Sequence, residues 1–100
     1  HQWQPIFVKH AETGRPALYV SHLISSQIDG MDRNESEAVL EQLIAIAEAP
    51  ALVYEHVWRD GDLVMWDNRC STHARTDFPP EETRLLRRCT LEGGPMIAAA

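Results

Sequence analysis

Residues 58–91 read WRDGDLVMWDNRCSTHARTDFPPEETRLLRRCTL, and this stretch carries most of the information about the fold. Asp60-Gly61 is a typical hairpin-turn pair placed between two apolar runs. The two adjacent prolines of DFPPEET remove two backbone donors, so that part is expected to be irregular. In the segments before and after the turn and the prolines, successive side chains alternate between two faces, as in a strand. The pattern predicts three strands, at residues 53–58, 63–66 and 84–91.

Upstream of this stretch, two short apolar runs at residues 6–8 and 17–20 flank a turn-rich segment. Gly14 in that segment can adopt the positive φ that tight turns require. Pro16 cannot donate a hydrogen bond to a sheet, which suits an edge or the start of a strand. Together these features predict an antiparallel hairpin.

One amphipathic helix is expected between the hairpin and the later strands. Its apolar residues recur at three- and four-residue steps, at Val39, Leu40, Leu43, Ile44 and Ala47. Asn34 is suited to cap the N-terminus, with Glu37 reaching back as in a capping box. Pro50 prevents continuation, so the helix should end near Glu48 or Ala49. The whole pattern predicts a mostly β fold with one covering helix, as in a barrel or a double-sheet jelly roll.

Composition limits the class of protein. A chain of 100 residues with 44% hydrophobic and 24% charged residues fits one globular domain. Nine basic against fifteen acidic residues give a net charge of −6, which argues against nucleic acid or an anionic membrane as a general partner. No apolar run approaches the ~20 residues that span a bilayer. The two cysteines make no disulfide framework, and we expect a reduced, cytoplasmic protein.

Two arginines are candidates for binding an anion. Arg84 and Arg88 lie four positions apart, so they share one side of a strand and also one face of a helix. Their planar guanidinium groups suit carboxylate or sulfonate anions. From spacing alone, a solvated charge run or ion pairs with Glu81 and Glu82 explain them equally well.

Cys70, His73 and Cys89 are residue types that can bind a metal, but each also has a simpler structural explanation. His73 lies in a polar loop after a strand, where a histidine is either a hydrogen-bonded structural residue or a metal ligand. The three residues together could belong to a zinc-stabilised module, but a structural zinc site needs four ligands and no second close pair is present. Buried thiols are the simpler expectation for the two cysteines.

The remaining histidines give weaker signals. His10-Ala11-Glu12 has the form of a His-x-acid ligand pair, but it falls in the expected hairpin turn, where these residues are adequate turn chemistry. His22 and His56 have no evident partner. Ser71 lies close to His73, but no nucleophile elbow is present, so a hydrolase is poorly supported.

The combined motif resembles the C-terminal signature of the taurine dioxygenase-like family of Fe(II)- and 2-oxoglutarate-dependent dioxygenases. The likeness covers nearly the whole chain, and the combined motif is far more specific than any one residue in it. Its pieces are Glu12-Thr13-Gly14-Arg15, Leu18-Tyr19-Val20, residues 30–37, Gly61-Asp62, Trp66-Asp67-Asn68-Arg69, His73, Arg84 and Arg88.

This resemblance implies a partial double-stranded β-helix, the jelly-roll architecture. It also implies iron held by two histidines and one carboxylate. By match, His73 is the distal histidine of that triad. Arg84 matches the residue that pairs with the far carboxylate of 2-oxoglutarate, and Arg88 matches the position that holds the substrate anion in sulfonate-using relatives.

In the family, the other two iron ligands form a His-x-Asp pair in an earlier segment. We therefore expect residues 1–100 to be the C-terminal part of a single dioxygenase domain, inactive alone. The implied reaction uses O2 to hydroxylate a small, anionic organic substrate, with succinate and CO2 as co-products. The alternative is a catalytically inactive β-sandwich fragment or relative that binds a small anion through Arg84 and Arg88. A truncated jelly roll exposes strand edges, so association into homo-oligomers is expected.

Overall fold

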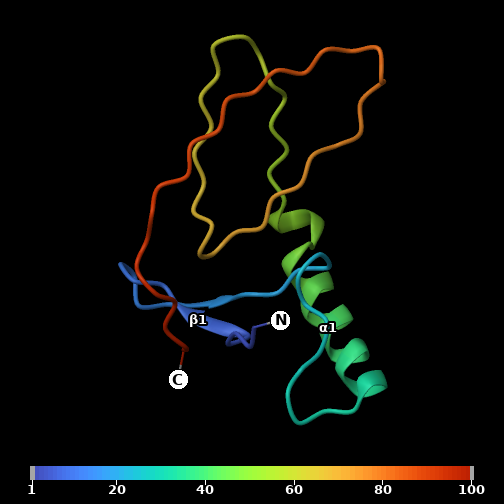
Figure 1. The fold of residues 1–100 in the computed structure, drawn as a ribbon, viewed down its shortest axis with the longest axis vertical. Coiled ribbons are helices and arrows are strands. Elements are labelled where there is room, and N and C mark those ends of the chain that lie inside the picture. The colour runs from blue at the N-terminus through green and yellow to red at the C-terminus, as the bar shows by residue number, and fades with distance from the viewer. Residues whose placement is uncertain (1, 100) are drawn as a thin grey trace.

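The computed structural model describes residues 2–99, and its helices and strands lie between residues 7 and 52. Their order is β1 (Phe7–Lys9), β2 (Pro16–Leu18), α1 (Arg33–Ala47) and the 3-10 helix η1 (Pro50–Leu52). After η1 the chain forms long loops that extend away from the hairpin and α1, and its last part returns to β1 (Figure 1).

The predicted hairpin is confirmed. β1 and β2 pair in antiparallel fashion, and Val8 is opposite Ala17. Gly14 in the connecting turn has a φ of +68°, in the left-handed region that glycine adopts without a steric penalty. Pro16 opens β2, where the lack of an N–H group is tolerated.

The second edge of β1 is occupied by the end of the chain, which the sequence patterns did not predict. The backbone N–H of Lys9 donates to the carbonyl of Ile97 at 2.7 Å, and the N–H of Ala99 donates to the carbonyl of Phe7 at 2.9 Å. An antiparallel bridge joins Val8 and Ala98. β1 is therefore covered on both edges, and Val8 is only 2% exposed.

Helix α1 begins slightly earlier than expected. Asp32, and not Asn34, is the N-cap, and its Oδ1 accepts the backbone N–H of Glu35 at 3.0 Å. Aspartate and asparagine cap equally well, so residue type alone does not favour Asn34 over Asp32. The C-terminal end agrees with the prediction, because the last helical residue is Ala47 and Glu48 is the C-cap.

The core lies between α1 and the hairpin. Val20, Leu40 and Ile44 form its buried centre. The partly buried side chains of Ile6, Leu18, Ile28 and Leu43 pack against it. The apolar stripe predicted for the helix therefore covers the hairpin.

A buried serine ties the loop before α1 to the helix. Ser36 is 1% exposed, and its Oγ accepts the backbone N–H of Ile28 at 2.6 Å. A buried polar group without a partner would be costly, and here both groups are satisfied.

The three strands predicted at 53–58, 63–66 and 84–91 are not formed within residues 2–99. The Asp60-Gly61 turn is present, with Gly61 at a φ of +90°. An alternating pattern predicts an extended backbone, but a strand also needs a hydrogen-bonded neighbour. The described residues therefore show one antiparallel two-stranded sheet and the covering helix, but not the β-sandwich that was expected.

The alternation itself is visible in the side chains of one of these segments. The rings of Tyr54 and His56 have centroids 6.0 Å apart, and those of His56 and Trp58 lie 4.8 Å apart with their planes nearly perpendicular. The three rings therefore follow one another along one side of an extended segment, as period two requires.

The region after η1 exposes many large apolar side chains. Among them are Val57 (77% exposed), Leu63 (87%), Met65 (83%), Leu85 (85%) and Leu91 (83%). These positions are apolar in sequence but pack against little in the described residues. Among these residues, no helix combines the length and the apolar character needed to cross a membrane.

Candidate functional site

The most connected polar cluster joins the β1–β2 turn to a second turn much later in the chain. His10 Nε2 lies 3.0 Å from Oδ2 of Asp67. On the other side of the ring, His10 Nδ1 accepts the backbone N–H of Thr13 at 3.2 Å, which favours the tautomer whose Nε2 proton faces Asp67. The hydrogen bond joins residues 57 positions apart, and the His10 side chain is only 14% exposed.

Arg69 is the centre of this cluster. Its Nε donates to Oδ1 of Asp67 at 2.9 Å and its Nη2 donates to Oδ2 at 2.6 Å, which is the bidentate geometry of a strong charge-assisted pair. Its Nη1 lies 3.0 Å from Oε2 of Glu12. One guanidinium group therefore bridges two carboxylates. We call His10, Glu12, Asp67 and Arg69 the turn clamp.

The charges of the turn clamp stabilise one another. Hydrogen bonding from Arg69 holds the pKa of the Asp67 carboxyl well below its usual range and also lowers the pKa of Glu12. The Asp67 and Glu12 carboxylates in turn raise the pKa of Arg69. All three groups are therefore ionised at neutral pH.

A metal ion does not fit the turn clamp. Ligand atoms of His10, Asp67 and Cys70 lie within 4.8 Å of one another, which is close enough to consider. Both carboxylate oxygens of Asp67 already accept hydrogen bonds from Arg69. A cation placed there would compete with a guanidinium group for the same oxygens and would be repelled by its charge.

The residue expected to bind iron lies beyond the second turn. His73 is exposed, and its ring lies against that of Trp66, with centroids 4.7 Å apart. Within residues 2–99 the imidazole has no hydrogen bond or ion pair, so its nitrogens are available. Imidazole is a suitable ligand for Fe(II). The chemistry of this donor fits the metal, although it is a single ligand.

The two candidate anion-binding arginines are exposed, and among the described residues no hydrogen bond or ion pair joins either of them to His73. The Arg84 guanidinium carbon lies 6.0 Å from the ring centroid of Phe78, a cation–π arrangement. Within the described part of the chain, neither Arg84 nor Arg88 forms an ion pair, so the pairing with Glu81 or Glu82 is absent. The structure leaves the roles assigned by resemblance untested.

The zinc interpretation is not supported by the described residues. Cys70 and Cys89 are both free and exposed, so the expectation of buried thiols was wrong. Cys70 is grouped with His10 and Asp67, and His73 and Cys89 are not part of that group. The zinc-stabilised module is therefore not assembled in residues 2–99.

The other histidines have partners that the sequence did not reveal. His56 lies 3.0 Å from Oδ2 of Asp62 and 3.0 Å from the hydroxyl of Tyr54. His22 lies 3.9 Å from Glu41 and 3.8 Å from Glu48 of the α1 C-cap. Both histidines act as local polar contacts in loops or at the helix surface.

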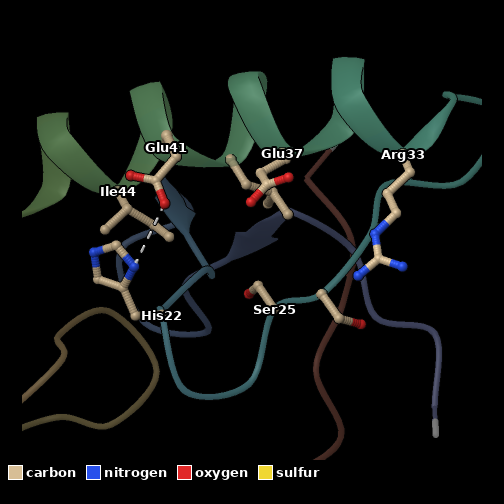
Figure 2. Close-up of a pocket in the computed structure, with 8 residues that line it drawn as sticks. His22, Ser25, Arg33, Glu37, Glu41 and Ile44 are labelled. Atoms are coloured by element: carbon tan, nitrogen blue, oxygen red, sulfur yellow. Dashed lines mark ion pairs between the residues drawn. The ribbon is translucent and has the colours of Figure 1, made fainter.

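A pocket of about 160 Å³ lies between α1 and the loop that precedes it (Figure 2). His22 and Ser25 come from the loop, and Arg33, Glu37 and Glu41 extend from the helix toward them. The lining carries both charge signs and is open to solvent at the His22–Glu41 pair, where both side chains are more than half exposed. None of the residues assigned to iron or anion binding lines it.

Comparison with known proteins explains why these motifs occur together. The family model described as "Taurine catabolism dioxygenase TauD, TfdA family" matches residues 1–90. The chain belongs to this family. The predicted resemblance is thereby confirmed, and the match includes His73, Arg84, Arg88 and the whole turn clamp.

Three relatives illustrate the range of the TauD/TfdA family. Pentalenolactone F synthase of Streptomyces avermitilis is 41% identical over 83% of the chain and 27% of its own length. The (S)-phenoxypropionate/alpha-ketoglutarate-dioxygenase of Sphingobium herbicidovorans is 37% identical over 97% of the chain and 33% of its own length. The alpha-ketoglutarate-dependent 2,4-dichlorophenoxyacetate dioxygenase of a Burkholderia strain is 40% identical over 89% of the chain and 30% of its own length. No solved structure gives a significant match.

The chain spans between a quarter and a third of the length of these relatives.

The turn clamp was missed by sequence reasoning. The sequence patterns present His10 and Glu12 as turn residues or a ligand pair, and Asp67 and Arg69 as parts of a family motif, without a contact between the two segments. The available signal was the presence of opposite charges on two turn-forming segments. That signal is weak, because pairing over 57 positions depends on how the segments pack.

Proposed function

We propose that residues 1–100 form the C-terminal part of a non-haem Fe(II)/2-oxoglutarate-dependent dioxygenase that hydroxylates a small anionic organic substrate. The observation that carries this proposal is the family match over residues 1–90, supported by two relatives whose names state dependence on alpha-ketoglutarate. We also propose that the apolar segments after η1 become strands of a jelly roll in the full polypeptide.

His73 is the residue of this chain that would hold the iron. Its imidazole nitrogens are not engaged by any described residue, and the ring is held against Trp66. When bound, Fe(II) and 2-oxoglutarate supply dioxygen activation, with succinate and CO2 released as co-products. The chain supplies one ligand, so the other two must come from elsewhere in the full polypeptide.

Arg84 would orient the cosubstrate. A guanidinium group donates two parallel hydrogen bonds to a carboxylate, which fixes both the position and the rotation of the bound acid. Phe78 lies beside Arg84 and would shield one side of its guanidinium group from water. Reduced access of water strengthens such a pair.

Arg88 would select for a negative charge on the substrate. Two of the relatives are named for phenoxypropionate and 2,4-dichlorophenoxyacetate, which are both carboxylates. A cation four positions from Arg84 would favour substrates of this kind and disfavour neutral analogues. The proposed substrate class is therefore a small organic carboxylate or sulfonate.

The test is succinate formation by the full polypeptide that carries this chain, with Fe(II), 2-oxoglutarate and O2. Phenoxyacetate and taurine serve as probes, and phenoxyethanol is the uncharged control. We expect an anionic probe to stimulate succinate formation while phenoxyethanol does not. Anion binding that depends on Arg84 and Arg88, without any metal binding or turnover, would instead support the inactive relative.

A further inference from the structure

In the turn that precedes His73, several groups donate hydrogen bonds to one residue, Asp67. The backbone carbonyl of Asp67 accepts the N–H of Ser71 at 3.1 Å and the Ser71 hydroxyl at 2.5 Å. It also accepts the N–H of Cys70 at 3.3 Å. The Asp67 side chain accepts the backbone N–H of Arg69 at 2.9 Å. Residues 67–71 are therefore one compact unit centred on Asp67.

Trp66 and His73 lie at the two ends of this unit. The indole N–H of Trp66 donates to Oδ1 of Asn68 at 2.8 Å, which holds the indole against the turn. The His73 ring packs on that indole with a centroid separation of 4.7 Å and an interplanar angle of 47°. The direction of the imidazole therefore depends on the closure of the turn between them.

The turn clamp is the polar connection between this unit and the rest of the structure. Within residues 2–99, every hydrogen bond and ion pair that joins residues 54–92 to residues 2–52 involves Asp67 or Arg69. The partners are His10 and Glu12, on the hairpin that α1 covers. The next polar attachment after the turn in the described chain is at residues 97–99, which pair with β1 through backbone hydrogen bonds.

We propose that Arg69 is a positioning residue for His73, acting through Asp67 and the 67–71 turn and anchored by Glu12. This inference rests on the proposed role of His73 as an iron ligand. Groups that orient a ligand from outside the coordination sphere typically change metal affinity by about 10–100-fold when they are removed. The side-chain contacts of Arg69 are with Asp67 and Glu12, so it acts on His73 only through the turn.

The chemistry of the cluster explains why an arginine is needed. Asp67 is held by two parallel donors while a third nitrogen of the same group reaches Glu12. A lysine has one compact ammonium and cannot span both carboxylates with this geometry. With glutamine at position 69, the two carboxylates lose their shared cation. The turn would then lose the guanidinium contacts that hold Asp67 and the link to Glu12, and only the His10–Asp67 hydrogen bond would still join it to the hairpin.

The first experiment uses the metal-free full polypeptide and requires no turnover. Nuclear Overhauser contacts between the ring protons of Trp66 and His73 report the geometry directly. We expect them in the wild type and in Arg15→Gln, an exposed arginine in the same hairpin turn. We expect them to be lost in Arg69→Gln and partly restored in Arg69→Lys. Full retention in Arg69→Gln would overturn the proposal.

The second experiment measures Co(II) affinity by titration, with the ligand-field absorption of Co(II) as the signature of coordination geometry. Arg69→Gln should weaken binding by at least about tenfold and alter the spectrum, while Arg15→Gln should change neither. Unchanged affinity and spectrum in Arg69→Gln would overturn the positioning role. If the wild type binds no Co(II), the proposed function fails and the positioning role fails with it.

Glu12→Gln keeps the test valid if Arg69→Gln does not fold. Glu12 is 64% exposed and contributes only the outer part of the cluster, so its loss should be tolerated. We expect Glu12→Gln alone to weaken Co(II) binding measurably, and unchanged affinity would contradict the anchoring step. Where Arg69→Gln folds, the double variant should lose no more affinity than Arg69→Gln alone, because both substitutions remove the same contact. Additive losses would separate Glu12 from Arg69 and contradict the anchoring step.

Discussion

Nη1 of Arg69 lies 3.0 Å from Oε2 of Glu12, a residue 57 positions earlier in the chain. This contact joins the Glu12-Thr13-Gly14-Arg15 turn to the Trp66-Asp67-Asn68-Arg69 turn, the two polar motifs on which much of the family resemblance depends. Two segments that seem unrelated in sequence therefore form one electrostatic unit.

Acid should weaken this unit selectively. The pKa of Asp67 is lowered in the folded state by Arg69, so its ionised form stabilises the fold above the unfolded-state value of about 3.9. That contribution is lost as the pH falls below about 4 toward the lowered pKa. We expect Asp67→Asn to reduce the melting temperature at pH 7 and to differ less from the wild type at pH 3.

The control for this prediction is Asp77→Asn, which changes an exposed aspartate outside the clamp. The melting temperature of this variant should equal that of the wild type, within experimental error, at both pH values. An Asp67→Asn effect of equal size at pH 7 and pH 3 would show that the ion pair is not its cause.

Replacing His73 tests the metal ligand. In the full polypeptide, His73→Ala should abolish iron-dependent turnover, because the position loses its only metal-binding atom. Succinate formation is the measurement. His22→Ala is the matched control. His22 lies in the loop before α1, is more than half exposed and faces Glu41, so this variant should keep wild-type turnover. Normal turnover in His73→Ala would remove His73 from the site.

Replacing Arg84 tests the cosubstrate site. A charge-assisted hydrogen bond contributes roughly 1.5–3 kcal/mol, and about 1.4 kcal/mol corresponds to a tenfold change in affinity. Arg84→Ala should therefore weaken 2-oxoglutarate binding by at least about tenfold, measured by titration. Arg87→Ala, an exposed neighbour, should bind as the wild type does. An unchanged dissociation constant in Arg84→Ala would remove Arg84 from this role.

The core between α1 and the hairpin can be tested with two isoleucines of one helix. Ile44 is 4% exposed, and truncation to alanine should lower the free energy of unfolding by about 2–5 kcal/mol. Ile46 is 62% exposed, and Ile46→Ala should change it by less than about 0.5 kcal/mol. Chemical denaturation measures both. Equal losses would show that α1 does not bury the stripe described here.

The isolated chain of residues 1–100 should associate. Large apolar side chains after η1 are exposed, and unpaired extended backbone invites pairing with another copy. Size-exclusion chromatography should show oligomers or aggregates that depend on concentration. A sharp monomer peak with cooperative thermal unfolding would contradict this.

Local signals predicted the first half of the fold well. The hairpin follows from Gly14 and Pro16, and the helix stripe follows from Leu40 and Ile44. Each depends on residues close in sequence, where backbone preference and periodicity act directly. The roles of His73, Arg84 and Arg88 were predicted from the family resemblance. The family match over residues 1–90 supports that resemblance.

By itself, the sequence determined the hairpin, the helix and its buried face, because each is encoded in short-range patterns, and it determined the family through the identity of motif residues along the chain. The tertiary structure decided whether extended segments pair and which charges meet. Residues 53–58 alternate as a strand should, yet within the described residues no neighbour completes their hydrogen bonds. Arg69 meets Glu12 only because the loops return to the hairpin, and no local preference of either residue specifies that approach.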